Sequence, residues 1–291
     1  MKIILRIFLY GSILALLYYL IRIDYVAFEK LQINYLFVAV SMIFLFLGFV
    51  FSAISWKVIL KLHNVHISVK QSIVSHGLPT FTKYIPGRVW TILGRAALIQ
   101  DKDKSVKFLS FISFKEQLIY LCLGFLISIY PMLKTPEIRS YSSLIILLSL
   151  AMFLVLFSKS LHKLFEVIWN KVFKKKISIP LIEKKEFIII SWYILFYWIL
   201  WSAGFYFLLY SVFGNVPLHY AFAFPLSVSL GLISIIFPGG IGVREGVITL
   251  FLVSNGIQPE IAVSFSILSR LWFVAGEILI FITALALRKK S

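Results

Sequence analysis

Residues 237–245 read FPGGIGVRE, a proline–glycine break that carries two opposite charges, Arg244 and Glu245. Apolar stretches flank this break at residues 220–236 and 246–254. Lipid cannot hydrogen-bond the backbone groups that such a break frees, so broken backbone at membrane depth persists only where protein buries it or water reaches it. The break is therefore the first place to expect a functional site, and it decides how the helices around it are arranged.

The composition is that of a membrane protein. Of the 291 residues, 60% are hydrophobic and 14% are charged, and the mean hydropathy is +0.96. Globular chains average about 45–50% apolar and about 25% charged residues. Several apolar stretches exceed the roughly 20 residues that a helix needs to cross a bilayer. We therefore expect an all-α polytopic membrane protein with a single membrane domain, residues 1–291, and no soluble catalytic domain.

The net charge of +17 does not indicate nucleic-acid binding. The basic residues lie mainly in loops between apolar stretches, as the positive-inside rule predicts. The single cysteine, Cys122, excludes an internal disulfide and a cysteine-based zinc site. The histidines form no cluster with acidic neighbours, so we expect neither a metal site nor a cofactor.

The apolar stretches divide into full spans and interrupted ones. Six are expected to be full spans: residues 3–21, 33–56, 108–130, 141–157, 187–213 and 261–287. Two are interrupted, residues 72–99 and 220–254, and neither half of either is long enough to cross alone. We expect these two to form re-entrant helical hairpins. The residues that break them are Pro86, Gly87, Pro238, Gly239, Gly240 and Gly242.

Lysine and arginine in the loops predict the orientation. With both termini in the cytoplasm, most loop lysines and arginines fall inside, and only Arg22, Lys30, Lys134 and Arg139 fall outside. The segment 158–186, with lysines and apolar residues at helical spacing, is expected to be an amphipathic helix on the inner membrane surface.

This orientation predicts an internal repeat. Residues 1–133 and 134–291 each read as span, span, hairpin and span, and the two halves run in opposite directions. Such an inverted-topology repeat is typical of transporters, and its paired broken segments indicate the binding site.

Charged residues in the expected membrane zone indicate the ligand. An unpaired charge there costs at least about 2.5–3.5 kcal/mol, so each faces a partner or a water-filled cavity. Basic residues outnumber acidic ones, which suits an anionic ligand, and arginine binds phosphate through its planar donor fork. The candidate substrate-binding residues are Arg88, Arg95, Glu116, Arg244, Glu245, Arg270 and Glu277.

Alternatives stay open at five of the charged positions in this zone. Arg88 and Arg270 can have a structural role instead of binding a ligand. Glu245 can instead cap the helix after Gly242 and pair with Arg270 or Arg244. Lys83 and Lys115 can extend to the membrane interface.

Two motifs resemble a known family. The sequence PGGIGVRE at residues 238–245, followed by Ser269-Arg270-Leu271, resembles the signature of the lysylphosphatidylglycerol synthase transmembrane-region family. Tyr84-Ile85-Pro86-Gly87-Arg88, followed by Gly94-Arg95, resembles its first-half motif. The resemblance covers most of the chain. Carried over position by position, it points to Pro86, Gly87, Arg88, Arg95, Glu116, Gly239, Gly240, Glu245 and Arg270.

The resemblance implies a flippase-like membrane domain in the cytoplasmic membrane of a bacterium or archaeon. In two-part members of the family, a separate C-terminal domain transfers the amino acid, and this chain ends at Ser291 after the last expected span. The resemblance therefore implies translocation and not synthesis. Stand-alone relatives resemble accessory proteins of glycolipid or polyprenyl-phosphate pathways.

The expected function is that of a lipid translocase and not of an enzyme. Its expected partner is a membrane lipid with an anionic headgroup: an anionic or aminoacylated phospholipid, or a polyprenyl-phosphate-linked lipid. Two alternatives are an integral-membrane transferase with Glu116 or Glu245 as base, and an accessory protein or scaffold of lipid synthesis. The sequence leaves the identity of the lipid open, and also whether the chain forms a homo-oligomer.

Overall fold

The computed structural model describes residues 29, 31–84, 89–99, 104–160, 163, 167, 183–234 and 238–288. In these residues the secondary structure is helical, without a strand. The long helices are α2 (Tyr35–Leu62), α5 (Val106–Lys134), α6 (Ser142–Phe157), α8 (Lys184–Phe213) and α11 (Pro259–Arg288). Counting the 3-10 helix η3 (Pro136–Tyr141) together with α6, five helices in the described part of the chain are long and apolar enough to cross a membrane. The expected all-α, multi-pass membrane protein is confirmed.

The first span, residues 3–21, lies outside the described residues, as does most of the segment 158–186. The remaining spans are present, and α2, α5, α8 and α11 extend past the expected limits at one or both ends. α5, for example, begins at Val106, because the side chain of Ser105 accepts a hydrogen bond from Phe108 N. A helix continues beyond the apolar stretch until a cap satisfies its free backbone groups.

Both interrupted stretches form hairpins. The first consists of α3 (Val69–Gly77), η2 (Leu78–Tyr84) and α4 (Val89–Ala97). The second follows η4 (Leu218–Phe222) and consists of α9 (Ala223–Ile233), η5 (Pro238–Gly240) and α10 (Val243–Ser254). α9 and α10 have 11 and 12 residues. At about 1.5 Å per residue, each is far shorter than the roughly 30 Å hydrocarbon core.

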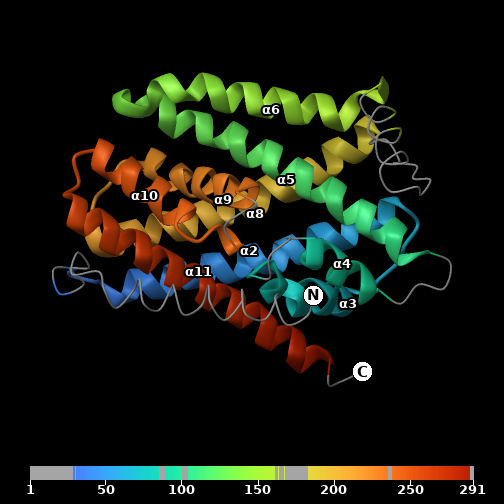
Figure 1. Ribbon diagram of the computed structural model, residues 1–291. Helices are drawn as coiled ribbons and strands as arrows, with labels where there is room; N and C mark the ends of the chain where they lie inside the picture. The colour runs from blue at the N-terminus through green and yellow to red at the C-terminus, as the bar shows by residue number, and fades with distance from the viewer. Residues whose placement is uncertain are drawn as a thin grey trace, which may run out of the picture.

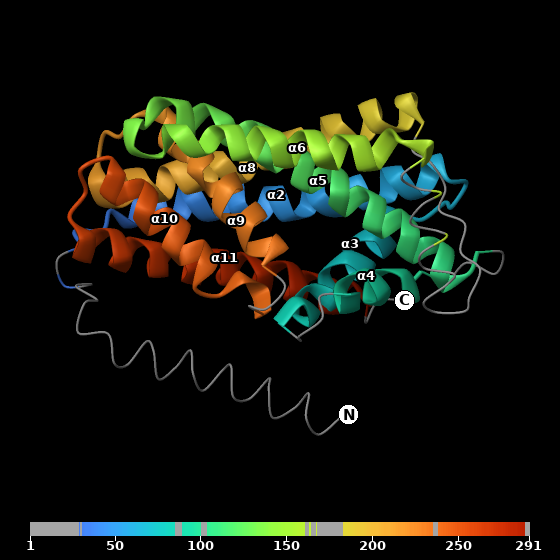
Figure 2. The same ribbon diagram turned by 45° about the horizontal axis from the view of Figure 1, so that its top comes forward.

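The hairpins enter the helix bundle from opposite ends (Figures 1 and 2). α3 and α4 lie at the end where α2 finishes and α5 begins, and α9 and α10 lie at the end where α11 begins. Their 3-10 segments meet inside the bundle, where η2 of the first hairpin contacts η5 of the second. The break predicted at residues 237–245 is therefore the inner tip of a hairpin.

α2 and α8 form the central helix pair on which the hairpins rest. Gly48 leaves room for the indole of Trp201, whose Nε1 donates to the Leu45 carbonyl at 3.2 Å. Ser41 Oγ donates to the Gly204 carbonyl at 2.6 Å. Small residues let membrane helices approach closely, and hydrogen bonds between helices add to this packing. α6 lies outside this pair and covers α5 (Figure 1).

Candidate functional site

A cavity of about 290 Å³ lies between the two hairpins. Among the described residues, its charged wall residues are Lys83 and Arg95 from the first hairpin, Arg244 from the second, and Glu116 from α5. Ligand pockets typically measure about 300–1,000 Å³, so this cavity suits a headgroup better than a whole lipid. The three basic residues against one acidic residue make its wall electropositive.

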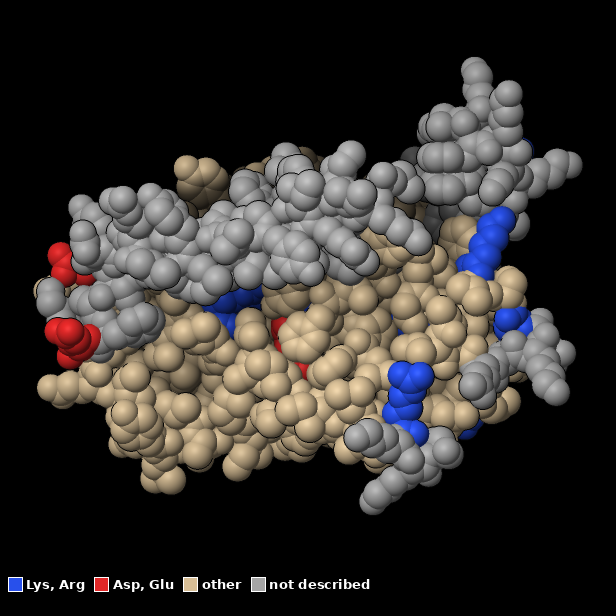
Figure 3. Space-filling model, turned by 60° about the horizontal axis from the view of Figure 1, so that its bottom comes forward, with Lys and Arg blue, Asp and Glu red and all other residues tan. Residues whose placement is uncertain are grey.

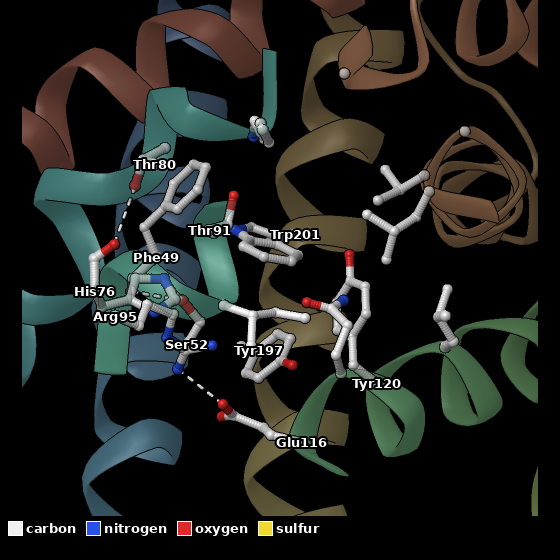
Figure 4. Close-up of a pocket in the computed structure, with 18 of the residues that line it drawn as sticks. Phe49, Ser52, His76, Thr80, Thr91, Arg95, Glu116, Tyr120, Tyr197 and Trp201 are labelled. Carbon is white, nitrogen blue, oxygen red and sulfur yellow. Dashed lines mark hydrogen bonds and ion pairs between the residues drawn. The ribbon is translucent and has the colours of Figure 1, made fainter. Parts of the chain in front are cut away.

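The first buried ion pair joins α4 to α5. Arg95 Nη2 donates to Glu116 Oε2 at 2.7 Å, and both side chains are buried. Figure 4 shows the two side chains pointing toward each other from opposite sides. The Arg95 guanidinium also lies over the Trp56 ring, 4.3 Å from its centroid, which adds a cation–π interaction. Two of the predicted site residues are therefore brought together, and they neutralise each other.

Arg270 on α11 is the centre of a second network. Its Nε lies 3.6 Å from Glu245 Oε1, and its Nη2 donates to the Gly239 carbonyl at 3.1 Å. The same Nη2 contacts the Tyr84 hydroxyl at 3.3 Å. Arg270 therefore ties α11 to the tips of both hairpins.

Glu245 has the structural role that the sequence left open. Its Oε2 accepts a hydrogen bond from Gly242 N at 2.7 Å, which caps α10, and its Oε1 faces Arg270. A carboxylate in the first turn also interacts favourably with the positive end of the helix dipole. Both interactions of Glu245 lie within the protein.

Glu277 is fully buried and has two partners on the first hairpin. Lys83 Nζ pairs with its Oε1, and the Tyr84 hydroxyl donates to its Oε2 at 2.8 Å. Lys83 and Tyr84 were missing from the predicted site residues, and Lys83 points into the cavity wall instead of extending to the interface. One signal could have identified them, since both lie within three residues of the Pro86-Gly87 break.

Lys115 belongs to a different cluster. Its Nζ lies 3.5 Å from Glu186 Oε1 and 3.2 Å from His63 Nε2, where α2, α5 and α8 meet. The side chain is buried and does not line the cavity. Lys115 is therefore held between helices and does not extend to the interface.

Arg244 is the cavity arginine without a carboxylate partner among the described residues. It is 6% exposed, and its guanidinium lies 4.4 Å from the Phe273 ring centroid and 5.6 Å from that of Phe224. Its Nε is buried and has no hydrogen-bond partner in the described part of the chain. Cation–π contacts stabilise this charge without neutralising it. The positive charge of the cavity is therefore concentrated at Arg244.

The tip of the second hairpin depends on glycine. Gly239, Gly240 and Gly242 have φ angles of 62°, 71° and 81°. A Cβ atom on Gly240 would lie 2.8 Å from both Cα and O of Gly231, so the α9 backbone approaches the tip directly. Of the other predicted break residues, Pro238 begins η5. Pro86, Gly87 and the candidate Arg88 lie outside the described residues.

The surface near the site is largely apolar. Figure 3 shows a mostly tan face on which Lys or Arg atoms and Asp or Glu atoms are visible within a recess near its middle. Of the paired side chains, Lys83 and Glu245 keep 24% and 15% of their area exposed. Charged groups therefore sit below an apolar surface, as expected for a polar site reached from within a membrane.

The comparisons with known proteins identify a family. The family model described as "Lysylphosphatidylglycerol synthase TM region" matches residues 3–276. This match includes both hairpins and their breaks. No curated protein and no solved structure matches the chain. The family consists of membrane domains related to lipid handling, and the chain belongs to it.

Proposed function

We propose that the protein is a lipid translocase, a flippase that moves an anionic lipid across the cytoplasmic membrane of a bacterium or archaeon. Its substrate is an anionic or aminoacylated phospholipid or a polyprenyl-phosphate-linked lipid. The observation that carries the proposal is Arg244, a buried cation that forms no ion pair with a described carboxylate, in a cavity between two hairpins. A guanidinium in this setting suits the phosphate of a headgroup.

The walls of the cavity support a route for the lipid tails. Phe114 and Leu118 of α5 line the cavity, and Phe114 is also exposed on the outer surface of the bundle. A headgroup bound at Arg244 would leave its acyl chains beside these residues, in the hydrocarbon of the bilayer. The lipid would not have to enter the bundle whole.

The ion pairs support alternating access by two inverted halves. Arg95 of α4 pairs with Glu116 of α5, the helix that follows the first hairpin. Glu245 of α10 pairs with Arg270 of α11, the helix that follows the second. The same connection occurs twice with the charges exchanged, which favours a repeat with halves at residues 1–133 and 134–291. Transporters built from such halves expose a central site to each side in turn.

Charges at the bundle ends support the orientation. The end of the bundle where the first hairpin enters holds the C-terminus of α2 with Lys61, and the N-termini of α3 and α5 with Lys70 and Lys107. The other end holds the C-terminus of α5 with Lys134, and η3 with Arg139. By the positive-inside rule, the first hairpin opens to the cytoplasm and the second to the outside.

The direct test uses proteoliposomes that contain a fluorescent, acyl-labelled phosphatidylglycerol. A membrane-impermeant quencher added outside reports how much lipid reaches the outer leaflet. The proposal expects faster and more complete quenching than in empty liposomes. Folded protein that gives the same quenching as empty liposomes would exclude translocation of this lipid.

Lipid analysis of a deletion strain separates translocation from the transferase alternative. A translocase leaves the lipid species unchanged but retains its substrate in the inner leaflet. Loss of a lipid species, measured by mass spectrometry, would favour the transferase.

Arg244→Gln is expected to weaken lipid binding with little effect on folding. Loss of the charge should weaken the binding of a short-chain phosphatidylglycerol about tenfold, equivalent to about 1.4 kcal/mol. The thermal unfolding temperature should change little, because the lost cation–π contact is offset by removal of a buried charge without a counter-ion. Calorimetric titration and thermal unfolding in detergent measure the two effects.

Arg95→Gln is the matched comparison for Arg244→Gln. It leaves Glu116 buried without its partner, which is expected to destabilise the protein by about 3–5 kcal/mol. Equal lipid affinity in Arg244→Gln and the wild type would contradict the assignment of Arg244 as the phosphate anchor.

A further inference from the structure

His76 is a titratable cavity residue that the proposed function does not yet use. It lies on α3 and lines the cavity beside Arg95 (Figure 4). Its Nε2 is 2.9 Å from Ser52 Oγ on α2. Histidine is the side chain whose charge most readily changes near neutral pH.

The hydrogen bonds around Ser52 determine the tautomer of His76. Ser52 Oγ donates its one hydrogen to the Phe49 carbonyl at 2.9 Å, so it can only accept from the imidazole. Nε2 of His76 therefore carries the hydrogen, and Nδ1 carries a lone pair. Nδ1 is buried and has no hydrogen-bond partner among the described residues. A buried lone pair of this kind is an unused proton acceptor.

The charges around His76 link this acceptor to the ligand. Arg95 of α4 and Lys83 of η2 face the imidazole, and α5 and α11 contribute their partners Glu116 and Glu277. α2 presents the neutral Ser52. Arg244 also lies in the cavity wall. Without a bound anion, these cations repel the positive charge that His76 would acquire on protonation. A bound anion removes this repulsion, so anion and proton each favour binding of the other.

We infer that Nδ1 of His76 is a proton-binding site that takes up one proton from water when an anionic headgroup binds in the cavity, so that lipid and proton are carried together. The inference rests on the proposed function. The negative charge of the headgroup and the positive charge of the proton cancel, so the two together carry no net charge. A pH gradient would therefore drive transport, whereas a membrane potential would not act on the loaded cavity.

Binding measurements test the linkage without requiring transport. Dihexanoyl-phosphatidylglycerol is a suitable probe, because its phosphodiester does not titrate between pH 6 and 8. Calorimetry in buffers of different ionisation enthalpy is expected to show uptake of about one proton per lipid, and affinity is expected to fall about tenfold per pH unit. His76→Gln, which keeps a donor for Ser52, is expected to show neither effect. His66→Gln removes an exposed histidine outside the cavity and should behave as wild type.

The outcomes separate the inference from the proposed function. Wild-type protein that binds and translocates the lipid without proton uptake or pH dependence overturns the proton site and leaves the translocase intact. Proton uptake that persists in His76→Gln also overturns the assignment. Wild-type protein that neither binds nor moves the lipid overturns the proposed function and this inference with it.

Discussion

Arg270→Ala is expected to abolish translocation and to lower the free energy of unfolding by about 3–5 kcal/mol, as loss of one partner of a buried ion pair does. The substitution leaves Glu245 without its cation and removes the donor to the Gly239 carbonyl. It also removes the contact with Tyr84, which links α11 to the first hairpin. Both hairpin tips lose their shared anchor. Proteoliposome transport and thermal unfolding in detergent measure the two effects.

Arg270→Lys separates charge from geometry. A lysine can keep the attraction to Glu245, but it lacks the fork that reaches Gly239 and Tyr84 at the same time. We expect a folded protein with at least a tenfold loss of transport. Arg139→Ala is the control, since Arg139 is exposed in η3, away from the cavity. Wild-type transport and wild-type unfolding in Arg270→Ala would contradict the role of Arg270 as the anchor.

Gly240→Ala is expected to open the second hairpin. At its φ of 71° an alanine is strained by about 1–2 kcal/mol. Its Cβ would also lie 2.8 Å from the Gly231 backbone, and overpacking of this kind typically costs about 1–3 kcal/mol more. The contacting atoms belong to the backbone of Gly231 and cannot rotate away from the added Cβ as a side chain could, so α9 and the hairpin tip must move apart. We expect loss of transport and a large decrease in the unfolding temperature.

Two neighbouring glycines provide matched controls for Gly240→Ala. Gly242 has a φ of 81° but open space around it, so Gly242→Ala should cost only the strain of about 1–2 kcal/mol. Gly246 lies within α10, and no atom would come within 4 Å of an added Cβ. Gly246→Ala should stabilise the helix by roughly 0.5–1 kcal/mol. Equal unfolding temperatures for Gly240→Ala and Gly246→Ala would show that the tip is not packed closely against α9.

The spans and the breaks could be predicted from the sequence, because each of them depends on a local stretch of residues. A stretch of apolar residues predicts a span, and Pro238-Gly239-Gly240 predicts a break, without reference to any distant residue. The residues at which the helices begin and end were harder to predict. α2 continues to Leu62 where hydropathy predicted an end at residue 56, since helices end at caps and not where polarity changes.

The candidate site could be predicted only in part from the sequence. The sequence identified Arg95, Glu116, Glu245 and Arg270 as charges in the membrane zone, and the structure places each of them in a buried or half-buried ion pair. For Glu245 the sequence was compatible with two roles. A carboxylate after a glycine break fits a helix cap as well as a ligand site, and the same residue types serve both.

The sequence by itself determined that this is a multi-pass helical membrane protein with two broken segments and more basic than acidic residues in the expected membrane zone. Only the tertiary structure decided how those charges are paired. Lys83 and Glu277 are 194 residues apart in the chain, and no local pattern relates them. Pairing depends on which helix faces come together at the hairpin tips. That packing neutralises Arg95 and Arg270, and it leaves Arg244 in the cavity wall without an ion pair to a described carboxylate.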